Sequence, residues 1–96
     1  MSQQSPGATW SFVTNHTAVL VCLAQDSGMR LRDVAEKIGI TERAVQRIVA
    51  DLEEAHVLSR QKSGRRNVYT LDTSIPLRHP LLRDKSVGDL LAALTK

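Results

Sequence analysis

The chain has 96 residues, enough for one small domain with a single modest core and little room for a second lobe or an enclosed active site. Hydrophobic residues make up 42% of it and charged residues 24%, as in ordinary globular proteins. The formal net charge of +3 is too small to indicate a nucleic-acid partner by itself, so the positions of the charges matter more.

The scarce residue types exclude several classes of protein. The three aromatic residues are Trp10, Phe12 and Tyr69, so the core must be built from Leu, Val, Ile and Ala, which favours packed helices over a β-sandwich. Cys22 is the single cysteine, which excludes an intramolecular disulfide and a cysteine zinc site. Because it lies among Val and Leu residues, we expect a small buried side chain and not a redox-sensing thiol.

The sequence contains no apolar run near the roughly 20 residues that span a bilayer. Residues 1–9 are polar and lack the apolar region of a signal peptide, so we expect a cytoplasmic, prokaryotic protein. Neither a nucleophile with a neighbouring base nor a glycine-rich phosphate loop is present, so we expect no enzyme and no cofactor. His16, His56 and His79 lack the spacing of metal ligands and are expected on the surface or at helix caps.

The composition divides the chain into three parts. Residues 1–9 are rich in Ser, Gln, Gly and Pro, and are expected to be disordered or loosely packed. Residues 10–75 carry the elements of one compact domain. Residues 76–96 form a connection and a C-terminal amphipathic helix, which serves packing or dimerisation.

The first helix is predicted to begin near Thr14 or Asn15, both good capping residues, and to end at Asp26-Ser27-Gly28. Gly28 is a natural residue for the position just after a helix end, and a short extended piece over 29–31 follows. A second helix is predicted over 32–37. Gly39 ends it, in a turn that favours a left-handed backbone.

A third, longer helix is predicted over 42–55, with Thr41 as its cap. Its apolar residues fall at i, i+3, i+4 and i+7, the spacing of one buried helical face. These residues are Val45, Ile48, Val49 and Leu52.

Two short strands are predicted over 57–61 and 67–71, joined by residues 62–66, in which Gly64 permits a hairpin turn. Pro76 and Pro80 mark an irregular connection. A last helix is capped by Ser86, with Asp89 three residues on. Its apolar stripe, which either packs back on the domain or pairs with a second copy, is Val87, Leu90, Leu91 and Leu94.

The segment 31–50 has small and apolar residues at the positions that a helix-turn-helix requires. Ala35 is small where two helices cross steeply, Gly39 lies in the turn, and Val34, Ile38, Ile40, Val45 and Ile48 fill the wedge between the helices. This segment and the hairpin after it resemble the winged helix-turn-helix of MarR-like and ArsR-like regulators over about residues 14–72. The resemblance implies a mainly α fold with a small β-hairpin, that is, three helices, a two-stranded wing and a C-terminal helix.

The polar face of the third helix agrees with this resemblance. Arg43, Gln46 and Arg47 lie opposite the apolar stripe, and Arg and Gln side chains pair with guanine and adenine edges in the major groove. We therefore predict that these three read bases. The residues predicted to hold phosphates are Thr41, Arg30, Arg32, Lys62, Arg65 and Arg66, with Arg60, Asn67 and Tyr69 as further wing contacts.

The sequence thus predicts a sequence-specific, double-stranded DNA-binding transcriptional regulator that acts as a homodimer, and the resemblance implies that it is a repressor. The predicted dimer interface consists of Trp10, Phe12, Val87, Leu90, Leu91 and Leu94, and no small-molecule effector can be named. Two alternatives stay open: a winged-helix module that binds an acidic protein through the same helix face, and an architectural protein that binds DNA without sequence preference.

Overall fold

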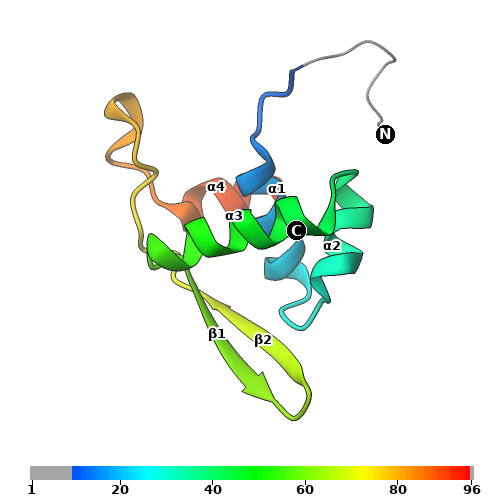
Figure 1. The fold of residues 1–96 in the computed structure, drawn as a ribbon. Helices are drawn as coiled ribbons and strands as arrows, with labels where there is room; N and C mark the ends of the chain where they lie inside the picture. The colour runs from blue at the N-terminus through cyan, green and yellow to red at the C-terminus, as the bar shows by residue number, and fades with distance from the viewer. Residues whose placement is uncertain (1–9, 96) are drawn as a thin grey trace.

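The computed structural model describes residues 10–95 as a helical body from which a two-stranded hairpin projects (Figure 1). Along the chain, the elements are α1 (Asn15–Gln25), α2 (Leu31–Ile38), α3 (Glu42–Glu54), β1 (Leu58–Ser63), β2 (Arg66–Leu71), a 3-10 helix η1 (Pro80–Leu82) and α4 (Val87–Leu94). This order confirms the predicted fold class, a winged helix-turn-helix with a C-terminal helix. Residues 1–9, predicted to be disordered or loosely packed, lie outside the described part.

Both ends of α1 agree with the prediction. The Thr14 side chain accepts a hydrogen bond from the Thr17 amide at 3.2 Å, as expected of a cap. The helix ends at Gln25, directly before the predicted stop at Asp26-Ser27-Gly28, but Gly28 does not have a left-handed backbone conformation. The turn is instead closed by the Asp26 carboxylate, which accepts from the Gly28 amide at 3.1 Å. Of the extended piece predicted over 29–31, Arg30 does have an extended backbone, while Leu31 already begins α2.

The turn between α2 and α3 has the predicted geometry. Gly39 has a φ of +87°, the left-handed conformation that glycine adopts without steric cost. Two residues later, the Thr41 hydroxyl accepts from the Ala44 amide at 3.0 Å and caps α3. The four stripe residues Val45, Ile48, Val49 and Leu52 are all buried, so the face of α3 that the periodicity predicted does point into the core.

At its other end, α3 closes in a Schellman motif whose left-handed residue is His56, with a φ of +65°. The His56 amide donates to the Glu53 carbonyl at 3.0 Å, and the Val57 amide donates to the Leu52 carbonyl at 2.9 Å. The reversal brings Val57 and Leu58 back into the core, where they are 4% and 3% exposed. The hairpin is therefore rooted in the core at its base.

The hairpin is longer than predicted, because its turn is shorter. Ser63 pairs with Arg66, so the connection is two residues, Gly64 and Arg65, and the predicted loop over 62–66 is wrong. Gly64 has a φ of +67°, as the first position of a type II′ turn requires. Beyond its base, β1 is exposed on both faces, so no hydrophobic pattern marks where the strand continues.

The C-terminal helix closes the core of the single chain. Val87 and Leu91 of α4 are 5% and 6% exposed and belong to the same apolar cluster as α1, against which α4 packs. Ser86 and Asp89 form the predicted capping box, with the Ser86 amide 2.9 Å from the Asp89 carboxylate. Within residues 10–95, every helix is too short or too polar to span a bilayer.

Candidate nucleic-acid interface

The exposed face of α3 carries the three residues predicted to read bases. Burial of its apolar stripe sets the rotation of the helix, which leaves Arg43, Gln46 and Arg47 exposed on the opposite side. Within residues 10–95, neither Arg43 nor Arg47 forms an ion pair. Their guanidinium groups are thus available to a partner molecule.

The acidic residues of α3 are arranged differently. Asp51 lies 2.9 Å from Nε2 of His16 on α1, and Glu53 lies 3.4 Å from Nε of Arg60 on β1. Both carboxylates therefore point toward neighbouring elements of the body. Because the first half of α3 is basic and its end acidic, an anionic partner is favoured at the first half.

A cleft of about 650 Å³ separates the first half of α3 from the hairpin. It is lined by residues from α3, from the start of α2 and from both strands, so three segments far apart in sequence meet there. Those of its lining residues that the sequence predicted as DNA contacts are Arg30, Gln46, Arg60, Arg65, Arg66, Asn67 and Tyr69. Glu42 also lines the cleft, and as an anion it opposes a phosphate there.

The other predicted contacts lie on the exposed surface outside this cleft. They are Arg32, Thr41, Arg43, Arg47 and Lys62. The Thr41 oxygen already caps α3, and its hydroxyl hydrogen is what remains to donate to a phosphate.

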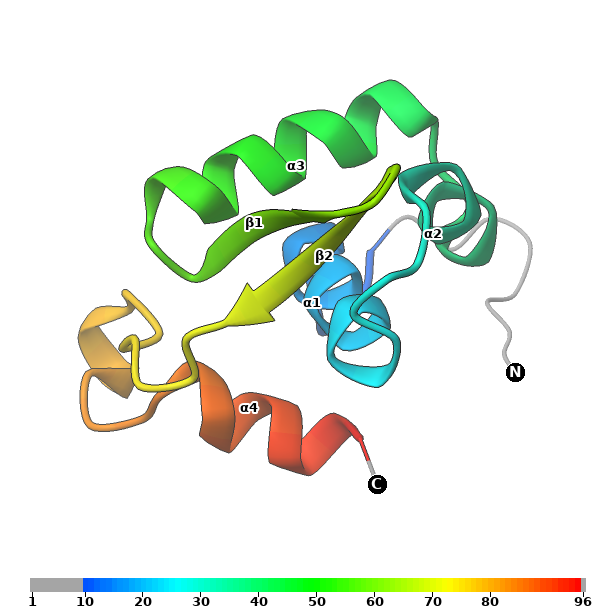
Figure 2. The ribbon, with the colours of Figure 1, turned by 90° about the horizontal axis from the view of Figure 1, so that it is seen from below.

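Two of the wing arginines have partners within the chain. Nη2 of Arg66 donates to the Gly28 carbonyl at 2.6 Å, which ties β2 to the loop between α1 and α2. The Tyr69 amide adds a second tie, to the Ser27 carbonyl at 3.0 Å. Arg60 is the partner of Glu53 at the base of the hairpin. In Figure 2 the hairpin is seen from below, the side on which it projects from the body in Figure 1. Lys62 and Arg65 form no ion pair among the described residues, so their charges are free for a partner.

Tyr69 was predicted as a wing contact, and the structure contradicts this. Although Tyr69 lines the cleft, its side chain is 3% exposed and belongs to the core, which leaves it almost no surface for DNA. Burial raises the pKa of its phenol, an effect that the nearby Arg60 guanidinium opposes. The prediction was wrong because Tyr69 lies near the base of β2. Which side chains of the hairpin lie near its base is known only from the sheet register.

The structure also shows the surroundings of the single cysteine and of His79. Cys22 is 8% exposed, as predicted, and burial raises the pKa of its thiol. The His79 ring accepts from the Leu81 amide at 3.1 Å and caps η1. No group of three or more metal-binding side chains occurs within residues 10–95.

The residues predicted for a dimer interface fall into two groups. Val87 and Leu91 are buried in the single chain and offer no surface, while Leu90 is half-buried. Trp10, Phe12 and Leu94 are 66%, 93% and 42% exposed. The rings of Trp10 and Phe12 meet edge to face, with centroids 4.8 Å apart.

Comparison with known proteins agrees with the fold. Residues 14–59 match a family model described as winged helix-turn-helix DNA-binding. A protein of Methanocaldococcus jannaschii, whose printed name is "Uncharacterized protein", is 29% identical over 70 residues. This alignment covers 72% of the chain and 15% of that much longer protein, and no solved structure matches. The described residues thus have the winged helix-turn-helix fold, and residues 14–59 resemble DNA-binding domains of that kind.

Proposed function

We propose that the chain is a sequence-specific, double-stranded DNA-binding regulator of transcription, similar to MarR-like and ArsR-like repressors. In this proposal α3 enters the major groove and the hairpin follows the neighbouring backbone. The observation that carries the proposal is the face of α3 that presents Arg43, Gln46 and Arg47 to solvent, without ion pairs among the described residues.

The chemistry of this face suits base recognition. Arg donates two parallel hydrogen bonds to the N7 and O6 atoms of guanine, and Gln pairs with N6 and N7 of adenine. With 13 residues, α3 is about 20 Å long, which is enough to lie in a groove about 12 Å wide and still reach the body. Asp51 and Glu53, held by His16 and Arg60, stay at the end away from the bases.

The phosphate contacts in this proposal come from Arg30, Arg32 and Thr41 on one side of α3 and from Lys62 and Arg65 on the other. Arg66 contributes mainly by holding the wing against the loop at Gly28. Each phosphate that a cation neutralises releases counterions, so binding should weaken steeply as salt is added.

The regulator acts as a homodimer in this proposal, because a second copy would cover the exposed apolar residues Trp10, Phe12 and Leu94. Winged-helix dimers bind half-sites about 34–36 Å apart, so the target should be an inverted repeat. Occupation of such a site within a promoter would block transcription.

The test is a selection from random double-stranded oligonucleotides at near-physiological salt, followed by sequencing of the bound DNA. We expect an enriched inverted repeat with wild-type protein and its loss with the triple variant Arg43→Ala/Gln46→Ala/Arg47→Ala. An enriched single half-site would remove the dimer from the proposal. Salt-sensitive binding without any motif would replace it by an architectural role. Failure to retain DNA at all would instead support a protein-binding module.

A further inference from the structure

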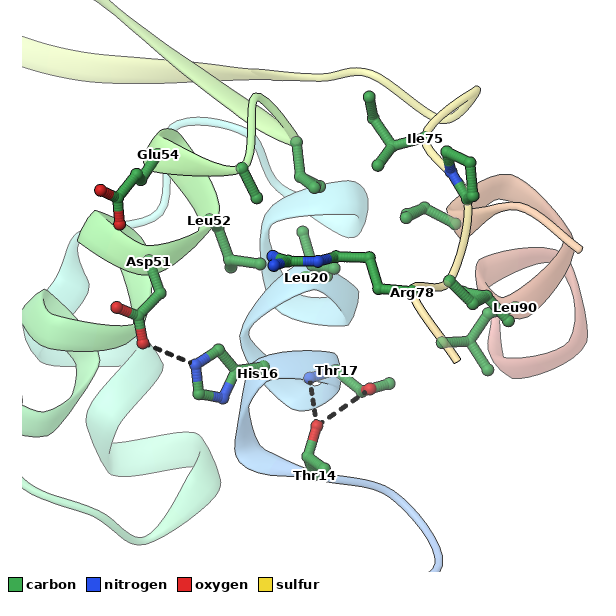
Figure 3. Close-up of a pocket in the computed structure, with 15 residues that line it drawn as sticks. Thr14, His16, Thr17, Leu20, Asp51, Leu52, Glu54, Ile75, Arg78 and Leu90 are labelled. Carbon is green, nitrogen blue, oxygen red and sulfur yellow. Dashed lines mark hydrogen bonds and ion pairs between the residues drawn. The ribbon is translucent and has the colours of Figure 1, made fainter. Parts of the chain in front are cut away.

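A second pocket, of about 410 Å³, lies at the C-terminal end of α3 (Figure 3). It opens between α1, the end of α3, the segment 75–78 and α4. It shares no residue with the cleft beside the wing. Its volume falls within the range of about 300–1,000 Å³ that is typical of small-molecule sites.

The floor of the pocket is apolar and its edge is acidic. Leu20, Leu52 and Val57 are core residues that form part of the floor. Asp51 and Glu54 stand at the edge, and Glu54 forms no ion pair within residues 10–95. The C-terminal end of α3 adds the partial negative charge of its last carbonyl groups. A ligand with an apolar body and one positive group would match both parts of this pocket.

The chain already places a cation of its own over the pocket. Figure 3 shows the Arg78 side chain extended from its loop across the opening, with its guanidinium directed toward Leu52 of α3. This guanidinium forms no ion pair among the described residues, although Asp51 and Glu54 line the same pocket. Arg78 also has a φ of +62°, a left-handed conformation that is strained for a residue with a side chain. An unpaired side chain over a cavity, on a residue whose backbone is strained, is well suited to be displaced.

We propose that this pocket binds a small lipophilic organic cation, which displaces the Arg78 side chain and whose ammonium group pairs with Asp51 and Glu54 at the edge. The apolar part of the ligand would rest on Leu20, Leu52 and Val57. An organic anion that pairs with Arg78 and His16 is disfavoured, because both carboxylates would repel it and Asp51 already holds His16 at 2.9 Å. The site is separate from the DNA-binding face and does not rest on the function proposed above.

The proposal is tested by titrating the full chain with benzyltrimethylammonium and following the backbone amide resonances by two-dimensional NMR. We expect saturable shifts concentrated at residues 16–20, 51–57 and 75–78. Two reference probes separate the parts of the ligand. Tetramethylammonium has the charge without the apolar body, and 3-phenylpropionate has an apolar body with the opposite charge. Both should bind more weakly than benzyltrimethylammonium.

Two variants, each with a matched control, test the residues involved. Arg78→Ala removes the competing guanidinium and should tighten binding of benzyltrimethylammonium by about threefold or more, whereas Arg83→Ala removes an exposed arginine outside the pocket and should change it less. Glu54→Gln should weaken binding by about threefold, with Glu36→Gln on α2 as its control. All four side chains are exposed, and the spectra themselves report whether each variant is folded.

Absence of localised shifts at millimolar probe in both the wild type and Arg78→Ala would overturn the proposal. Tighter binding of 3-phenylpropionate than of benzyltrimethylammonium would also overturn it, in favour of an anion site. Equal effects of the pocket variants and their controls would reduce the binding to the overall charge of the protein and would exclude the site.

Discussion

The two ends of α3 are opposites in charge and in surroundings. The first half exposes Arg43, Gln46 and Arg47 to solvent, whereas Asp51 and Glu53 at the other end are held by α1 and by the base of the hairpin. A residue with a left-handed backbone conformation lies on each side of the helix, Gly39 before it and His56 after it. One helix thus offers a free cationic face to a partner and anchors its acidic end within the body.

The difference indicates how a small domain can present a binding face without a second lobe. The buried stripe of α3 sets the rotation of the helix, and the Schellman motif at His56 returns the chain so that the wing stands beside the basic half. The cleft between them gathers Arg30, Gln46 and Arg65 from three separate segments. The binding face is therefore a consequence of how both ends of α3 are closed.

The largest expected effect comes from removing a cation at the basic end. Arg47→Ala should weaken binding to the selected DNA site by about 1–3 kcal/mol and relax preference at one base position, because in the proposed complex it removes a bidentate base contact. Glu54→Gln at the acidic end is the matched control and should leave affinity and preference nearly unchanged. Both are measured by competition binding against single-base variants of the site. An unaltered base preference in Arg47→Ala would exclude this residue from base reading.

The turn before α3 should be the position most sensitive to backbone change. Gly39→Ala should lower the free energy of unfolding by about 1–2 kcal/mol, because alanine at a φ of +87° meets its own backbone. A Cβ at Gly39 would have no other atom within 4 Å, so the loss is conformational and not a clash with neighbours. Urea unfolding followed by circular dichroism measures it. A loss well below this range would mean that the turn adapts to a different conformation.

At the opposite end, the same reasoning predicts a gain. His56→Gly should raise the free energy of unfolding by about 0.5 kcal/mol, because glycine relieves the left-handed strain at a φ of +65° and returns only part of this as unfolded-state entropy. Ala55→Gly, one residue earlier at a φ of −80°, is the control and should destabilise by about 0.5–1 kcal/mol. If both variants destabilise equally, strain at His56 is negligible.

The sequence predicted those features that depend on residues close together in the chain. The caps of α1, α3 and α4 and the buried stripe of α3 depend on residues within one or two helical turns, and each was predictable from spacing. Gly39 was predictable because its turn lies between two clear helices. These local features suffice for the fold class and for the residues on the open face of α3.

The failures involve contacts between distant segments or strands without a hydrophobic pattern. The bond from Arg66 to Gly28 joins residues 38 apart, and no local signal indicates that this wing arginine is held inside the chain. The burial of Tyr69 depends on its place opposite Arg60 in the hairpin, which the sequence does not reveal. The sequence did not predict the pocket under Arg78 either, because four separate segments of the chain form it.

The smallest expected effect concerns the link between the acidic end and the wing. In a double-mutant cycle with Glu53→Gln and Arg60→Gln, the coupling energy should be below about 1 kcal/mol, because at 3.4 Å and with half of the Arg60 side chain exposed the pair is largely screened by solvent. The free energies of unfolding of the four proteins in urea provide the cycle. A coupling above about 2 kcal/mol would mean that Glu53 fixes the base of the wing, and Glu53→Gln should then also weaken DNA binding. With the weak coupling expected here, the wing is held by its buried base and by Arg66, and in the proposed complex the acidic end serves to keep negative charge away from the DNA.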